Sequence, residues 1–302
     1  MPASPPFAVV AQQVLVAIIW GGTWIAGRIL AAEMPPLSAA GWRFVLGTLT
    51  LGALVWRASA GLPRITGADA ARVVAMGATG ILLYNLCFFY GLQQVQAGRG
   101  ALVIALNPVA VALAAWLLMG ESLRPARLLG VAIALVGCLL VIGRGDPFAL
   151  LRGEIGRGEV AILGCVAGWT AYTLIGRRAS RTLSPLSMTF YASLAGGLML
   201  LIAGLVDGSL RSLPVLSWQA WAALLYLGVL GSGFSYVWYA NGVMRLGAAR
   251  AAAFINLVPV SAVLLAALLL NEHVGLSVLA GGAMVLLGVW LTNRKHPGGI
   301  KA

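Results

Sequence analysis

The chain has 302 residues, of which 61% are hydrophobic and 9% charged, and its mean hydropathy is +0.95. One soluble core could not bury so much apolar surface, whereas a bilayer replaces water around the outer faces of helices. The composition therefore excludes an ordinary soluble protein. The net charge of +12 comes from basic residues that stand singly or in pairs between apolar runs. This pattern suits lipid headgroups and argues against a nucleic-acid partner.

Ten apolar segments are long enough to cross a bilayer, which takes about 20 residues of helix. They predict an all-α membrane protein of ten transmembrane helices, at 8–30, 37–56, 70–93, 99–119, 126–143, 159–177, 186–206, 218–243, 249–270 and 275–293. The longest connection, 144–158, separates a first repeat at 8–143 from a second at 159–293, and residues 294–302 form a basic cytoplasmic tail.

Arginine and lysine are more frequent on the side of the predicted bundle that holds the N-terminus. By the positive-inside rule, both termini are expected in the cytoplasm of a bacterium, with the protein in the inner membrane. Arg28 and Arg43 fall on the opposite side, near helix ends, where we expect their side chains to reach the membrane surface.

The two halves of the sequence repeat one another in register. Matching residues recur at one offset, which shifts once by two residues along the chain; they include Trp20 with Trp169, Arg28 with Arg177, Pro108 with Pro259, Glu121 with Glu272, Gly130 with Gly281, and Gly137 with Gly288. Since each half has an odd number of predicted spans, the second half must be inverted relative to the first. Inverted repeats of this kind are typical of secondary transporters.

The stretch ALVIALNPVAVALAAWLLMGESLRPARLLGVAIALVGCLLVI (101–142) has a mid-helix Pro, a Gly-Glu near the helix end and a final Gly-spaced helix. Residues 252–291 repeat this arrangement. The pattern resembles the EamA module of the drug/metabolite transporter superfamily, and within it the bacterial amino-acid exporters, including the aromatic amino-acid exporter. The resemblance implies two such modules, ten helices and outward transport of small metabolites.

Pro108 and Pro259 lie near the middles of two predicted helices. A mid-helix proline has no N–H to donate to the carbonyl four residues back, and its ring clashes with that carbonyl. The carbonyls of Ile104 and Ile255 therefore need other partners. Interrupted helices at matching positions predict a substrate site and a place where the helices bend. The alternative is a packing kink without a functional role.

Aromatic and amide side chains fall near the middles of several predicted helices. The indole N–H of a mid-membrane Trp needs a polar partner or a wet cavity. We expect one cavity without a fixed charge at mid-depth, lined by Trp20, Trp24, Tyr84, Phe88, Asn107, Trp169, Tyr172, Tyr239 and Asn256. Such rings are also common in ordinary helix packing, so a core role for each remains the alternative.

Glu121 and Glu272 are expected to stabilise the N-termini of the helices that directly follow them, at 126–143 and 275–293. The glycine stripes Gly130/Gly137 and Gly281/Gly288 predict close helix packing, within one chain or between subunits.

Taken together, these features predict an exporter of neutral and aromatic amino acids or similar small metabolites that works by alternating access. No Asp, Glu or His falls at mid-membrane depth in the predicted helices, so we expect facilitated diffusion or exchange instead of proton coupling. The alternatives are a drug or other metabolite efflux permease of the same superfamily and a membrane-embedded lipid enzyme. We expect no metal, no cofactor and no enzymatic activity, with lipids and a small-molecule substrate as partners, in a monomer or weak homodimer.

Overall fold

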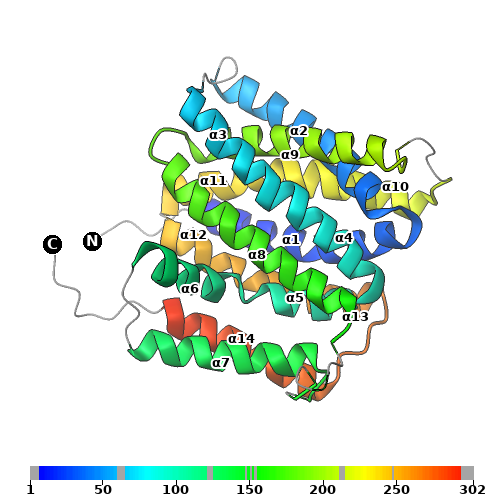
Figure 1. Ribbon diagram of the computed structural model, residues 1–302, viewed down its shortest axis with the longest axis vertical. Helices are drawn as coiled ribbons and strands as arrows, with labels where there is room; N and C mark the ends of the chain where they lie inside the picture. Colours follow the sequence, from blue (N-terminus) through cyan, green and yellow to red (C-terminus); the bar gives the residue numbers. More distant parts are fainter. Residues whose placement is uncertain are drawn as a thin grey trace.

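The computed structural model describes residues 7–59, 65–120, 125–146, 148–149, 152, 155–210, 215–246 and 248–293. All regular structure in these residues is helical, and the helices pack side by side in one bundle (Figure 1). Both the predicted tail at 294–302 and Glu121 lie outside the described residues.

The first half contains these helical segments: α1 (Phe7–Glu33), α2 (Pro36–Ser59), α3 (Gly67–Met76), the π-helix η1 (Gly77–Leu83), α4 (Tyr84–Gln94), α5 (Ala97–Ile104), α6 (Asn107–Met119) and α7 (Pro125–Ile142). The second half follows the same order: α8 (Arg157–Ala179), α9 (Pro185–Val206), α10 (Trp218–Leu225), the π-helix η2 (Tyr226–Phe234), α11 (Ser235–Leu246), α12 (Ala248–Ile255), α13 (Leu257–Leu269) and α14 (Leu276–Asn293).

Eight helices of the described chain are long and apolar enough to span a membrane. They are Phe7–Glu33, Pro36–Arg57, Gly67–Gln94, Ala97–Met119, Arg157–Ala179, Pro185–Val206, Trp218–Leu246 and Ala251–Leu269. Two shorter apolar helices, Leu128–Ile142 and Leu276–Thr292, close the two halves. The predicted all-helical membrane fold is thus confirmed, while ten full spans and inverted repeats stay predictions.

Short polar residues start several of these helices. The Thr66 hydroxyl accepts a hydrogen bond from the Asp69 backbone N–H at the start of α3, and Ser217 does the same for Ala220 at the start of α10. Ser184 caps α9, in which Pro185 is the first residue. A capping hydroxyl satisfies a backbone donor that has no intrahelical partner. The caps fix where each helix begins once its apolar face is buried.

The third apolar helix of each half contains a π-helical segment, η1 or η2. Both segments are rich in glycine, with the sequences GATGILL and YLGVLGSGF. π-Helical turns are rare and are frequently found at functional sites. The sequence analysis did not predict either segment.

The last helices of the two halves, α7 and α14, lie against each other at one side of the bundle (Figure 1). A Cβ atom added at Gly137 would stand 2.6 Å from the Gly281 carbonyl oxygen, and one added at Gly288 would stand 2.4 Å from that of Gly130. Backbone therefore touches backbone along this seam. The close packing predicted from the glycine stripes is confirmed, and it joins two helices of one chain.

Filling the seam should destabilise the protein. In Gly137→Ala the new methyl group meets backbone atoms and must push α7 from α14, so we expect a loss of about 1–3 kcal/mol. The matched control is Gly41→Ala in α2, where the nearest atom is the Leu201 side chain at 3.4 Å. The control should be neutral or slightly stabilising, because Ala favours helix over Gly. Thermal unfolding of both purified variants measures the difference, and equal midpoints would contradict the packing argument.

Candidate functional site

Both predicted helix breaks are present. The helix α5 ends at Ile104, and α6 begins at Asn107 after two intervening residues, with Pro108 in its first turn. In the second half α12 ends at Ile255, and α13, which contains Pro259, begins after the turn residue Asn256. Pro259 is buried and Pro108 is half-buried. Both helices are therefore interrupted just before their prolines, while a bend at these points and a role in gating stay predictions.

The amides beside these breaks are half-buried, and Asn107 Oδ1 is shielded from solvent and has no hydrogen-bond partner among the residues that the structure describes. Asn256 stands before α13, and its side chain does not cap that helix. Within the described chain, no hydrogen bond links either amide to the aromatic residues of the predicted site. Their roles in the site stay predictions.

The predicted aromatic residues form two groups. In the first, the Trp20 ring of α1 lies 5.6 Å from Tyr236 and 5.4 Å from Tyr239 of α11, centroid to centroid. The Trp20 indole N–H donates to the Gly231 carbonyl in η2 at 3.1 Å. A mid-membrane Trp was expected to need a polar partner, and the backbone of the π-helix supplies it.

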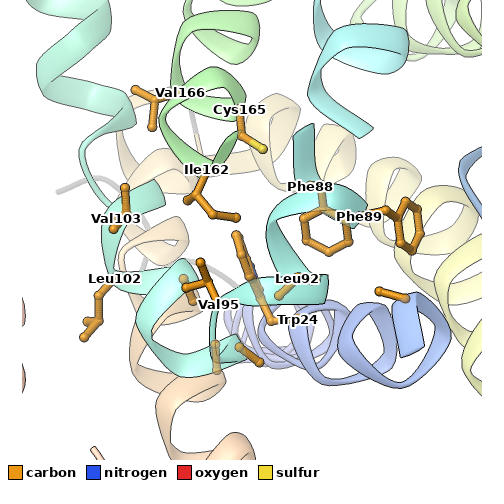
Figure 2. Close-up of a cluster of buried hydrophobic side chains, with 14 of the residues drawn as sticks. Trp24, Phe88, Phe89, Leu92, Val95, Leu102, Val103, Ile162, Cys165 and Val166 are labelled. Atoms are coloured by element: carbon orange, nitrogen blue, oxygen red, sulfur yellow. The ribbon is translucent and has the colours of Figure 1, made fainter. Parts of the chain in front are cut away.

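The second group runs across α1, α4 and α8. Its ring centroids follow one another at 5.0 Å (Trp24–Phe88), 6.1 Å (Phe88–Tyr84), 5.9 Å (Tyr84–Trp169) and 5.1 Å (Trp169–Tyr172). Figure 2 shows Trp24 and Phe88 among Leu92, Ile162 and other core side chains. These two rings are buried, whereas Tyr84, Trp169 and Tyr172 are half-buried. The half-buried rings leave surface on which a ligand could stack.

Arg43 lies beside the second group, with its guanidinium carbon 5.6 Å from the centre of the Phe88 ring. Its charge also acts on Tyr84 and on Tyr236, which contacts Trp20 in the first group. The residue is 8% exposed. Arg43 Nε donates to Ser232 Oγ at 3.0 Å, and Nη1 donates to Asn85 Oδ1 at 3.0 Å.

This position corrects two expectations. Arg43 lies seven residues after the start of α2, roughly 10 Å along the helix axis. Ser232, its partner, is midway between Trp218 and Leu246, the ends of a membrane-spanning helix. Arg43 is thus not at the membrane surface, and the prediction of a site without fixed charge at mid-depth was wrong. In the sequence, Gly47 lies one turn after Arg43 on the same face of α2. A small residue there indicates that another helix packs closely against that face.

Gly47 and Gly228 bring the backbones of α2 and η2 together. A Cβ atom at Gly47 would stand 2.8 Å from Ser232 Cβ, and one at Gly228 would stand 3.1 Å from the Arg43 carbonyl oxygen. Small residues permit this approach of transmembrane helices. This close approach places Ser232 within hydrogen-bond distance of the Arg43 guanidinium. The side chain therefore finds a polar partner inside the bundle and does not have to extend to the membrane surface.

At one end of the bundle, polar bonds tie the two halves together. The Glu272 carboxylate, just beyond α13, accepts hydrogen bonds from the backbone N–H groups of Ala97 and Gly98 at 2.9 and 3.0 Å. Glu272 therefore caps α5 in the other half, whereas the sequence predicted a cap on the helix that directly follows Glu272. The helix dipole explains the attraction in either case.

A buried ion pair stands beside this cap. Arg99 Nη2 of α5 lies 2.6 Å from Glu159 Oε1 of α8. Two hollows open at the same end, near Arg28, and the larger has a volume of about 340 Å³ and is lined by Arg28, Ala31, Ala32, Leu92 and Gln93. Neither hollow is lined by residues of the two aromatic groups.

The residues that could hold a metal ion are poorly placed for it. Among the described residues, no three His, Cys, Asp or Glu side chains gather in one group. The described carboxylates Glu33, Asp69, Glu159 and Glu272 instead bond to hydroxyls, arginines or backbone N–H groups near helix ends.

The fold is that of a multi-pass helical membrane protein in which buried Arg43 of the first half bonds to Ser232 of the second. The chain belongs to the EamA-like transporter family, whose model matches residues 8–143 and 156–294. It is therefore a transporter by family.

The relatives are similar along almost their whole length. The uncharacterized transporter YyaM of Bacillus subtilis is 27% identical over 273 residues, which cover 90% of this chain and 89% of YyaM. A protein named "Probable terminal-alkyne amino-acid exporter", from Streptantibioticus cattleyicolor, is 29% identical over 290 residues. The alignment covers 94% of this chain and 93% of that protein. A solved crystal structure has the same fold, with a TM-score of 0.64 at 20% sequence identity. The superposition covers 94% of this chain and 96% of the chain in that structure.

Removing the Glu272 cap should weaken the contact between the halves. Glu272→Ala leaves the Ala97 and Gly98 N–H groups without their acceptor, and we expect a loss of about 1–3 kcal/mol. Glu272→Gln keeps one oxygen and should lose less. The control is His273→Ala, an exposed neighbour, which should unfold at the wild-type temperature. If Glu272→Ala also unfolds at that temperature, the cap does not stabilise the bundle.

Proposed function

We propose that this transporter exports neutral and aromatic amino acids, or similar small metabolites, across the bacterial inner membrane. The observation that carries the proposal is the set of half-buried rings on α1, α4, α8 and α11 around one buried arginine. The name of the Streptantibioticus relative supports an amino-acid substrate. The direction of transport follows from that name and from the family resemblance of the sequence.

The chemistry of the centre suits an amphipathic ligand. Half-buried faces such as those of Tyr84, Trp169 and Tyr172 can stack on an aromatic or apolar side chain. Aromatic faces also attract an ammonium group. Because stacking surfaces discriminate weakly between rings, broad selectivity is expected. Drug-like amphipathic molecules remain an alternative substrate class.

The transport mechanism in this proposal is alternating access around the centre. The helix breaks at Pro108 and Pro259 and the π-helices η1 and η2 stand at corresponding places of the two halves. They are natural points at which helices can bend while the rest of each half moves as a unit. The carboxylates of the described residues are engaged near helix ends, so we propose facilitated diffusion or exchange instead of proton coupling.

In this proposal the two halves are inverted repeats and both termini are cytoplasmic. Reporters fused to the C-terminus should therefore be active in the cytoplasm: green fluorescent protein should fluoresce and alkaline phosphatase should stay inactive. The opposite pair of results would contradict the orientation.

Export can be tested with purified protein in liposomes and with cells. Liposomes should exchange radiolabelled phenylalanine or tryptophan, and an imposed pH gradient should leave the flux unchanged. Cells that express the protein should tolerate toxic aromatic amino-acid analogues. Trp169→Ala and Trp20→Ala should each lower the flux at least tenfold, because each removes a stacking face or the contact that fixes it.

The control is Trp56→Ala, which removes a Trp of α2 that is 60% exposed on the outside of the bundle. Its flux should match the wild type at equal expression. Wild-type flux in Trp169→Ala and Trp20→Ala would show that both rings only pack helices. Absence of exchange in wild-type liposomes would contradict amino-acid transport itself.

A further inference from the structure

We propose that Arg43 binds the carboxylate of the transported molecule, so that the transporter selects aromatic and apolar carboxylates. This inference rests on the proposed function, since it assigns the substrate of that same centre. It also reaches beyond amino acids, because an aromatic monocarboxylate without an ammonium group carries the same recognised group.

The first argument is charge. An arginine side chain stays protonated inside a protein. In the described chain no carboxylate lies within 4.0 Å of the Arg43 guanidinium, where the ion pairs are Arg72–Asp69, Arg99–Glu159 and Arg152–Asp146. A buried charge without an opposite charge costs several kcal/mol. An anionic ligand would remove that cost, which gives the empty site a specific affinity for anions.

Arg99 provides the comparison within the same protein. It is also buried, at 6% exposed, and its charge is matched by Glu159 at 2.6 Å. Among the described residues, one buried arginine is thus paired with a carboxylate and the other contacts neutral groups. The difference is expected if the carboxylate that belongs to Arg43 arrives with the substrate.

The second argument is geometry. The Asn85 amide donates from Nδ2 to the Ile81 carbonyl in η1 at 2.8 Å, so its oxygen faces Arg43 Nη1. Ser232 of η2 holds Nε, and the rings of Phe44 and Phe88 lie 5.5 and 5.6 Å from the guanidinium carbon. The plane of the guanidinium is therefore fixed from several sides. Its third nitrogen, Nη2, makes no hydrogen bond to the described residues, which leaves donors for a carboxylate.

The third argument is position. Arg43 is on α2 of the first half, while Ser232 is on η2 of the second. A carboxylate bound here would have the half-buried rings of both aromatic groups beside it. Because the guanidinium bonds to both halves, binding of a negative group would act on their interface, as alternating access requires.

The test is binding by the purified full-length protein, measured by calorimetry and by ligand-dependent thermal stabilisation. Four ligands keep the phenyl ring and change the charged ends: L-phenylalanine, L-phenylalaninamide, phenethylamine and 3-phenylpropionate. We expect phenylalanine to bind at least tenfold more tightly than its amide or phenethylamine, since a charge-assisted contact with the guanidinium is lost. Binding of 3-phenylpropionate decides whether the ammonium group is needed.

The variants Arg43→Gln and Arg43→Lys test the residue. In Arg43→Gln the preference for carboxylates should fall to about threefold or less, while Arg43→Lys should keep part of it, because a point charge replaces the planar fork. The matched control is Arg99→Gln, which removes the paired arginine. It should lower the unfolding temperature and leave the carboxylate preference intact.

The outcomes separate the two proposals. If 3-phenylpropionate binds through Arg43 and phenylalanine does not, the carboxylate site stands and the amino-acid substrate falls. If phenylalanine and its amide bind equally to the wild type, or if Arg43→Gln folds and keeps the preference, Arg43 is not the carboxylate site, although amino-acid transport can still hold. Failure of both carboxylates to bind the wild type overturns both proposals.

Discussion

The arrangement of the bundle depends on one constraint: the positive charge of Arg43 must be held among apolar helices, with no carboxylate of the described residues within 4.0 Å of it. Its neutral partners come from two different helices, Asn85 of α4 and Ser232 of η2. Both depend on irregular backbone, since the Asn85 amide is fixed by a carbonyl of η1 and Ser232 lies within η2. Gly47 and Gly228 then allow α2 and η2 to approach. A buried charge of this kind in a membrane is costly and typically functional.

The irregular backbone segments face the same requirement, because their displaced polar groups also need partners inside the protein. Lipid cannot hydrogen-bond to a displaced carbonyl, so non-helical backbone is tolerated in a membrane where it is buried in protein or lines a cavity. The Gly231 carbonyl of η2 meets the Trp20 indole N–H, and the Ile81 carbonyl of η1 meets Asn85. Irregular backbone in both π-helices is thus bonded to side chains of neighbouring helices, whereas in the seam between α7 and α14 glycine packs on glycine.

Much of this fold could be predicted from local sequence. Hydropathy located the helices, Pro108 and Pro259 located the breaks, and the spacing of Gly130, Gly137, Gly281 and Gly288 indicated a tight seam. The rings of Trp20, Tyr84, Phe88, Trp169 and Tyr172 do meet other aromatic rings. The misplaced features depend on which helix lies against which. Arg43 was expected at the surface because its partners, distant in sequence, could not be identified, and Glu272 was assigned to the following helix because its true partner, α5, is equally distant.

The central claim is that substrate binds between the two aromatic groups with its carboxylate on Arg43. The most direct test is an experimental structure of the protein in the presence of L-phenylalanine, with Arg43→Gln prepared in parallel. The account predicts density for the carboxylate within hydrogen-bond distance of the Arg43 guanidinium, with the phenyl ring beside Tyr84, Trp169 or Trp20, and no such density in Arg43→Gln. Phenylalanine bound elsewhere, or bound at this centre with its carboxylate turned away from Arg43, would contradict it.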